Sequence, residues 1–243
     1  MRTGTIAQNL KASLVAGALA GLLVAAFHFL ATEQVVEEAV GREAALGPAE
    51  EVFSRTVQRL GLFGGFLLYG VSWGLIFAGV YQLAAGRLPG RQGWQKGLVL
   101  AGIALWSVGV FPLLKYPARP PGVGDEGTIE ARQAYYLLYT ALSVVAAVGA
   151  LGLAEALQDT VLRAWRWPIV AGAYAAACAL IYILMPASPD ESPADFADLL
   201  GRFQALSLAG LVLFWLALGG AFGPLQLLFA EGEAAGGRPS GPR

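Results

Sequence analysis

The sequence predicts an all-α protein, a polytopic membrane helix bundle with about six transmembrane helices. Of its 243 residues, 56% are hydrophobic and 14% are charged, whereas a soluble domain carries about 25% charged residues. Six segments are apolar and long enough to span a bilayer, and the charges between them are sorted by sign. We therefore expect membrane lipid around most of the surface of this protein.

Polar or helix-breaking residues bound each of the six segments. The first ends before the acidic residues that begin at Glu33, which are predicted to form a loop. The third stops at a cluster of prolines, the fourth begins after Thr128, and the fifth begins at Pro168. Glycines and Pro224 weaken the end of the sixth, which favours a shorter helix there. Within about 2–4 residues at each end, the segments lie near 11–32, 61–85, 97–114, 133–157, 168–185 and 199–228.

The charge of the connecting segments predicts the orientation. Taken together, the N-terminal segment, the loops after the second and fourth helices, and the C-terminal segment carry nine basic and four acidic residues, whereas the other three loops together carry seven basic and thirteen acidic residues. The positive-inside rule places basic loops in the cytoplasm, so both termini are predicted to be cytoplasmic. Trp94, Trp165 and Trp167 lie beside these basic residues, where an aromatic belt is expected.

An internal repeat predicts three helical hairpins in one membrane domain. Arg132 follows Ala101 at the same distance in sequence as Arg202 follows Ala171, and a proline-rich acidic loop lies between in both cases. The hairpins would cover about 11–85, 97–157 and 168–228 of a domain at 1–230, with a flexible polar tail at 231–243. Chance similarity among helices rich in Ala, Gly and Leu is the alternative.

Glycines at four-residue spacing predict close helix packing. Such spacing lets two helices approach each other in lipid, and it carries no information about transport. The pairs are Gly17/Gly21, Gly61/Gly65, Gly70/Gly74 and Gly219/Gly223.

Polar residues gather near the predicted outer mouth of the bundle. Arginines stand at the outer entrance of each even-numbered helix, with glutamines beside them, and are predicted to ring a vestibule. The alternative is that these arginines extend from the interface to the lipid headgroups. The residues are Arg59, Arg132 and Arg202, with Gln58, Gln133 and Gln204.

His28, near the outer end of the first segment, is a candidate metal ligand. Glu33 and Glu37 follow it, and Met185 lies at a similar depth on the fifth segment. Imidazole, carboxylate and thioether groups suit divalent transition metals. A five-residue spacing from His28 to Glu33 does not place both on one α-helical face, so a packed or interfacial histidine is the alternative.

The polar loop between the third and fourth segments is the least generic part of the chain. It carries Lys115 and Arg119, followed by Asp125, Glu126 and Glu130. We expect either a cap that recruits substrate, with Asp125 as a candidate ligand, or a stiff connection held by its own ion pairs.

The sequence contains no motif of several enzyme classes. It has no nucleotide-binding P-loop, no HExxH and no G-x-S-x-G. The lone Cys178 and the lone His28 rule out the common zinc patterns, and the near-neutral charge gives no support to nucleic-acid binding. We therefore expect no catalytic activity and no bound cofactor.

The most distinctive residues of the chain lie in and just after the central loop. They are Phe111-Pro112, Lys115-Tyr116-Pro117-Ala118-Arg119-Pro120-Pro121, Gly124-Asp125 and Arg132-Gln133-Ala134-Tyr135-Tyr136. With these residues the chain resembles the CbtA family of predicted cobalt transporter subunits. The resemblance implies a subunit in a prokaryotic inner membrane that takes up cobalt for cobalamin, with a small single-helix partner, CbtB, that has a histidine-rich end. The family is generally described with five spans, whereas the segments here predict six.

The leading hypothesis is a membrane subunit that moves cobalt or another divalent transition metal inward. The alternative is a scaffold or accessory subunit that does not transport and whose outer loops dock a partner. A homo-oligomer is compatible with either hypothesis. A membrane enzyme acting through Arg59, Arg132 and Arg202 would need these arginines to converge with a carboxylate on one pocket.

Overall fold

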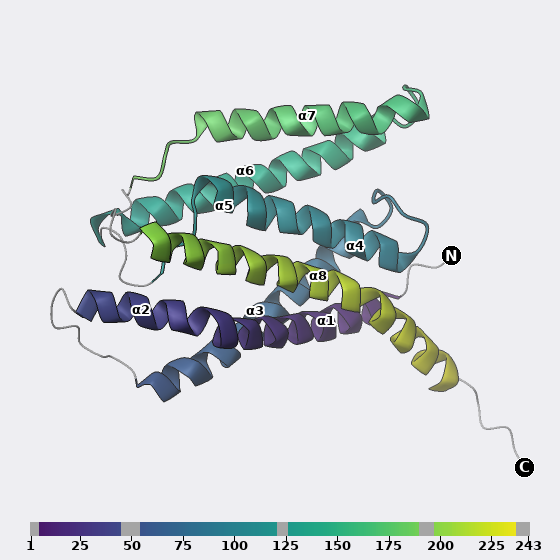
Figure 1. The fold of residues 1–243 in the computed structure, drawn as a ribbon. Helices are drawn as coiled ribbons and strands as arrows, with labels where there is room; N and C mark the ends of the chain where they lie inside the picture. Colours follow the sequence, from purple (N-terminus) through teal and green to yellow (C-terminus); the bar gives the residue numbers. More distant parts are fainter. Residues whose placement is uncertain (1–4, 45–53, 121–125, 190–196, 237–243) are drawn as a thin grey trace, which may run out of the picture. The chain divides into compact units, whose positions relative to one another are not determined.

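The computed structural model describes residues 5–44, 54–120, 126–189 and 197–236, and it is helical with no strand in these ranges (Figure 1). The chain forms two compact units. Unit 1 comprises residues 1–29, 53–102 and 212–243, and unit 2 comprises 30–52 and 103–211. The elements are α1 (Ile6–Phe27), the π-helical turn η1 (His28–Thr32), α2 (Glu33–Ala44), α3 (Arg55–Ala84), α4 (Gly93–Ala104), the π-helical turn η2 (Leu105–Val110), α5 (Phe111–Lys115), the 3-10 turn η3 (Glu126–Thr128), α6 (Ile129–Ala156), α7 (Arg163–Leu184) and α8 (Ala197–Gly236).

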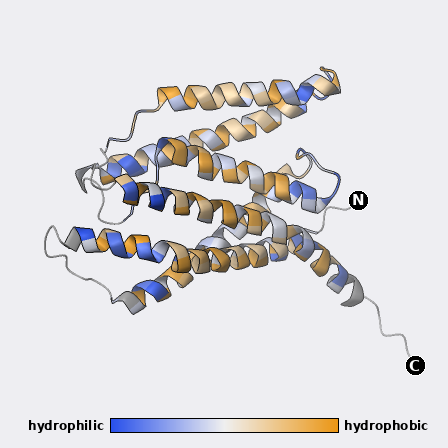
Figure 2. Cartoon of the chain, viewed as in Figure 1, coloured by the Kyte–Doolittle hydropathy of each residue, from blue (hydrophilic) through white to orange (hydrophobic). Residues whose placement is uncertain are grey.

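The predicted number of spans is confirmed over the described residues. Six helical stretches are long and apolar enough to cross a membrane, and each contains one of the six predicted segments in large part. Figure 2 shows apolar residues along the lengths of these helices and hydrophilic residues gathered towards many of their ends. The stretches are Ile6–Arg42, Thr56–Ala84, Gly93–Lys115, Ile129–Ala156, Ala164–Leu184 and Ala197–Gly232. The orientation of the termini and the three-hairpin arrangement stay predictions.

The prediction of an acidic loop from Glu33 onward is wrong, because these residues form α2. The segment is rich in Glu, Ala and Val, and Glu and Ala are good helix formers. Arg42 Nη2 also donates to Glu38 Oε1 over 2.6 Å, one turn back along α2. Such i,i+4 pairs stabilise an exposed helix, so the local sequence supports helix where the charge suggested a loop.

The first helix begins at a capping box. The Thr5 hydroxyl accepts from the Gln8 backbone N–H over 3.2 Å, and the Gln8 side-chain oxygen accepts from the Thr5 N–H over 2.8 Å. Two N–H groups that the first turn leaves without helical partners are thereby satisfied.

In unit 1, glycines bring α1 and α3 into backbone contact. A methyl group on Gly17 would overlap the carbonyl oxygen of Gly70, and one on Gly21 would overlap that of Phe66. Gly74 faces the Ser13 backbone in the same way. The predicted close packing is therefore confirmed for Gly17/Gly21 against Gly70/Gly74, and it forms the long interface between α1 and α3.

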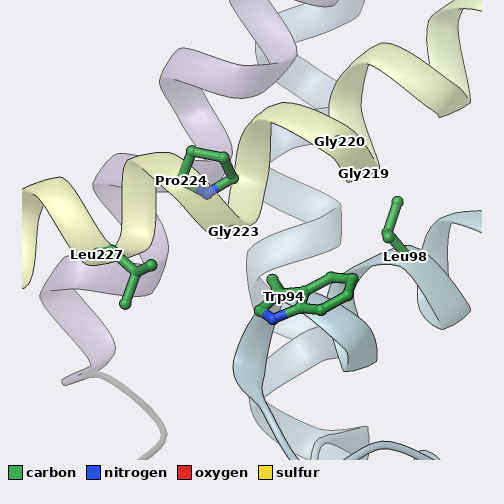
Figure 3. A pocket seen from close by; sticks show the side chains of 7 residues that line it. All are labelled: Trp94, Leu98, Gly219, Gly220, Gly223, Pro224 and Leu227. Atoms are coloured by element: carbon green, nitrogen blue, oxygen red, sulfur yellow. The ribbon is translucent and has the colours of Figure 1, made fainter.

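The second half of α8 packs on α4 within unit 1 (Figure 3). Gly219 lies against Ala101 and Gly223 against Trp94, so no side chain separates the two helices there. Trp94 and Leu98 face this glycine stretch across a shallow apolar pocket of about 200 Å³. The expectation of a shorter last helix is wrong, because α8 continues through Pro224 to Gly236. Packing against neighbouring helices makes such glycines and prolines tolerable in membrane helices.

The interior of unit 1 combines aromatic rings with one buried amide pair. Phe222 of α8 packs edge-on against Tyr81 of α3, with ring centroids 4.7 Å apart. At the same end, Gln226 Nε2 donates to Asn9 Oδ1 over 2.6 Å, and both side chains are buried. The pair joins α8 to α1, and each amide satisfies part of the other's hydrogen-bonding capacity.

In unit 2, aromatic residues fill the space between α5, α6 and α7. A buried cluster contains Phe111, Tyr116, Tyr139, Cys178 and Met185. The Phe111 and Tyr139 rings are 4.7 Å apart, which is a typical distance for an aromatic pair. α6 and α7 run side by side along this cluster (Figure 1).

The first half of α8 packs on α2 within unit 2. Val35 and Ala39 of α2 meet Leu199 and Leu200 of α8 in a small buried cluster. An ion pair between Glu38 and Arg202 lies beside it, with Glu38 Oε2 2.9 Å from Arg202 Nη1.

Candidate substrate pocket

A pocket of about 520 Å³ lies in unit 2 where the central loop meets α6 and α8. This volume is within the usual range of about 300–1,000 Å³ for small-molecule sites. The residues that line it are Leu113, Tyr116, Pro117, Ala118, Arg119, Ile129, Arg132, Gln133, Tyr136, Ser188, Phe203 and Ser207.

The proline pattern of the loop explains why the helix stops at this pocket. Pro112 lies in the first turn of α5, where a missing N–H is tolerated, and its carbonyl accepts from the Tyr116 N–H over 2.9 Å. Pro117 disfavours the helical conformation at the residue before it. Tyr116 accordingly leaves the helix, with φ −126° and ψ 80°, and the chain then turns along the pocket wall.

Two side chains tie this loop to the end of α7. The Tyr116 hydroxyl donates to the Pro186 carbonyl oxygen over 2.8 Å. Lys115 Nζ donates to the Tyr182 carbonyl oxygen over 3.0 Å and lies 4.5 Å from the centre of the Tyr182 ring. Burial, and then the neighbouring Tyr135, raise the pKa of the Tyr116 hydroxyl. This hydroxyl therefore remains a hydrogen-bond donor at neutral pH.

The charged groups of the pocket wall are basic. Arg119 comes from the loop and Arg132 from the start of α6, and both are half-buried. Gln133, Ser188 and Ser207 add neutral polar groups. No acidic residue is among the described residues that line the pocket.

The buried cluster next to the pocket contains two sulfur-bearing side chains. Tyr116 lines the pocket and also belongs to the buried cluster that holds Cys178 and Met185, and Tyr136 packs against that cluster. Cys178 is a free thiol. The structure thus brings the predicted ligand Met185 near the central loop, in the same cluster as this thiol.

A π-helical turn adjoins this cluster and was not predicted. In η2, Ser107 is buried and its hydroxyl donates to the Ile103 carbonyl oxygen over 2.7 Å. Gly109 lies against the Leu211 side chain of α8, and Trp106 stacks on Phe111. Such π-turns interrupt α-helices frequently at functional sites. The hydropathy pattern of the segment contains no signal for it.

The other predicted metal ligands are distributed over both units. His28 stacks on Phe66 in unit 1, with ring centroids 5.2 Å apart, whereas Glu33 and Glu37 belong to α2 in unit 2. Asp125 lies outside the described residues. No group of three or more His, Cys, Asp or Glu side chains that could hold a metal ion occurs in the described part of the chain. The metal-binding role of these residues stays a prediction.

The residues of the predicted polar ring are also distributed over both units. Arg132 and Gln133 line the pocket together, whereas Arg202 points to Glu38 and lies 3.8 Å from Asp198. Gln204 is half-buried on α8. In unit 1, the Arg59 guanidinium lies 5.8 Å from the centre of the Phe29 ring.

Sequence reasoning missed several lining residues. Phe203 and Ser207 lie one turn apart on α8 and share a face, which their i,i+4 spacing could have indicated. Ser188 follows α7 in a part of the chain with no local pattern, so only the fold places it at the pocket. Arg119 was noted as a loop charge but was not assigned to the ring.

Comparison with models of known protein families identifies a match over most of the chain. A family model described as "Probable cobalt transporter subunit (CbtA)" matches residues 6–226. No curated protein and no solved structure matches the chain.

Proposed function

This chain belongs to the CbtA family of probable cobalt transporter subunits, and on that premise we propose that it is a membrane subunit of an uptake transporter for cobalt. The observation that carries the proposal is the extent of the match. It includes most of the chain and reaches from the first spanning helix into the last.

The buried sulfur pair of unit 2 supports a role in handling a transition metal. Cys178 and Met185 lie in one buried cluster of unit 2 together with Phe111, Tyr116 and Tyr139. Thiolate and thioether groups are soft ligands, and a site's ligand type contributes to its choice of metal. We propose that the ion passes this pair on its way through unit 2.

Two sulfur atoms do not complete a coordination shell. In this proposal, further ligands come from Glu33 or Glu37 of the same unit, or from a histidine-bearing partner of the CbtB type. Inward transport across a prokaryotic inner membrane, with both termini in the cytoplasm, is part of the same proposal.

Uptake of radioactive cobalt by cells that produce variants of the chain tests this function. Met185→Leu removes the thioether and conserves most of the volume, and Cys178→Ala removes the thiol. We expect the double variant to take up cobalt several-fold more slowly than the wild type. Ile181→Leu, which alters a neighbour of the same cluster without removing sulfur, serves as the control.

The variants separate transport through the pair from a purely structural role. If the double variant is present in the membrane at the wild-type level and transports at the wild-type rate, the sulfur pair has no part in the path. If the chain itself makes no difference to cobalt entry, transport is excluded, and a scaffold that docks a partner through its outer loops becomes the function to test.

A further inference from the structure

Two arginines reach the pocket of unit 2, and a guanidinium has no acceptor to offer a metal cation. We propose that this pocket binds an anionic group rich in oxygen, a phosphate or a carboxylate. The inference is independent of the proposed transport function, because it follows from the guanidinium groups, the neutral donors and the size of the pocket.

The two arginines are the main evidence for an anion. Arg119 and Arg132 reach the same pocket from the loop and from α6. A guanidinium offers a planar fork of N–H donors that matches the oxygens of a carboxylate or phosphate, and it has no acceptor to offer a cation. Two such groups in one wall repel a divalent cation and attract an anion.

The neutral polar groups of the pocket wall also suit an anion. The Gln133 side chain and the hydroxyls of Ser188 and Ser207 can all donate hydrogen bonds to oxygen. Ile129, Arg132 and Gln133 belong to the start of the 28-residue helix α6, where the helix dipole adds positive potential, part of which Glu130 of the same turn offsets. The Tyr116 hydroxyl is not counted among these donors, because it donates to Pro186.

The size of the pocket indicates more than a single small ion. A volume of about 520 Å³ accommodates an anionic group together with part of the molecule that carries it. Leu113, Ile129 and Phe203 supply apolar surface for that part. Two sources present this chemistry, namely the headgroup of an anionic lipid and a small free anion such as citrate.

Binding to the purified full chain tests the inference in two arms. The first arm measures the shift of the thermal unfolding midpoint in detergent on adding inorganic phosphate or citrate, against chloride at equal ionic strength. The second counts retained phosphatidylglycerol against phosphatidylcholine by native mass spectrometry. The variants are Arg119→Gln/Arg132→Gln and Arg132→Lys. The charge-matched control is Arg87→Gln/Arg91→Gln, at two exposed arginines of unit 1.

We expect at least one arm to show binding by the wild type and the control, and the double glutamine variant to bind at least tenfold more weakly. The responding arm identifies the source as a free anion or a lipid. Arg132→Lys keeps the charge but loses the planar fork of N–H donors, so we expect an intermediate loss of anion binding. This conservative variant also tests the inference if the double variant does not fold. The inference is overturned if neither arm shows binding by the wild type, or if Arg132→Lys and the double variant bind as the wild type does.

Discussion

The Tyr116 hydroxyl donates a hydrogen bond to the carbonyl oxygen of Pro186 over 2.8 Å. Through this bond, the central loop of unit 2 is fixed to the chain that leaves α7. The same tyrosine lines the pocket and packs on Tyr139, with ring centroids 5.5 Å apart. One side chain therefore links the shape of the pocket to the interior of the unit.

Replacing Tyr116 by Phe tests this link. The substitution removes one hydrogen bond and keeps the ring, so we expect a loss of about 1 kcal/mol of unfolding free energy. Chemical unfolding of the purified chain in detergent measures it. Tyr182→Phe, at an exposed tyrosine of the same unit, is the control and is expected to change stability less. Equal effects of the two substitutions would mean that the Pro186 contact contributes little.

The pH dependence of this contribution has a definite sign. Burial raises the pKa of Tyr116, so the folded state holds the phenolic proton more tightly than the unfolded state, whose tyrosines titrate near about 10. The stabilisation is complete below that value and is lost as the pH rises through the folded pKa. We expect the stability difference between the wild type and Tyr116→Phe to be constant from neutral pH to about 9 and to shrink above about 10. A difference that falls between pH 7 and 9 would contradict the assignment.

The glycine interface of unit 1 predicts that a single methyl group is harmful. At Gly70, an added Cβ would overlap the backbone of Gly17, so Gly70→Ala forces α1 and α3 apart. We expect a loss of about 1–3 kcal/mol, as for other overpacked interfaces, seen as a lower unfolding midpoint. Gly79→Ala on the same helix is the matched control, because nothing lies within 4 Å of a Cβ there. We expect Gly79→Ala to leave stability unchanged or to raise it by about 0.5–1 kcal/mol. If Gly79→Ala lowers stability, the loss caused by Gly70→Ala cannot be assigned to the interface between α1 and α3.

The buried pair Asn9–Gln226 suits a double-mutant cycle. Replacing either amide by Leu leaves the other buried without this hydrogen bond, at a cost of about 1–3 kcal/mol. Replacing both removes the pair, and we expect the double variant to lose less than the sum of the two single losses. Unfolding free energies of the four chains measure this coupling. Strict additivity would show that the 2.6 Å contact does not stabilise unit 1.

The exposed ion pair Glu38–Arg202 is expected to matter little. Its side chains are 32% and 46% exposed, and exposed pairs of this kind contribute little to stability. Glu38→Gln and Arg202→Gln should each lower the free energy of unfolding only slightly, and the loss should diminish further in high salt. A larger, salt-independent loss would indicate that the adjacent packing of Val35 and Leu199 depends on the pair.

Most of the fold could be predicted from the sequence, because a spanning helix is defined mainly by its length and apolar character. The predictions failed where acidic residues were taken to indicate a loop and where glycine and proline were taken to indicate the end of a helix. Glu33 begins a helix because its neighbours are helix formers, and Pro224 lies inside one because packing at Gly219 and Gly223 supports it. The π-turns depend on tertiary contacts such as Gly109 with Leu211, which no local pattern contains.

Less of the candidate site could be predicted. Arg132 and Gln133 follow a distinctive loop and were predicted from their place at a helix entrance, and both line the pocket. Ser188 and Ser207 could not be identified, because they reach the pocket from parts of the chain far from the loop. The proposed ligands His28, Glu33 and Glu37 have suitable chemistry, and their role in metal binding stays a prediction.

The initial rate of radioactive cobalt entry tests the central claim most directly. It compares cells whose cobalt uptake depends on this chain with the same cells lacking it, at equal energy supply and with any partner subunit unchanged. We expect entry to be several-fold faster with the chain, and the excess to disappear in competition with unlabelled cobalt. Equal initial rates with and without the chain would contradict its role as a subunit of a cobalt transporter.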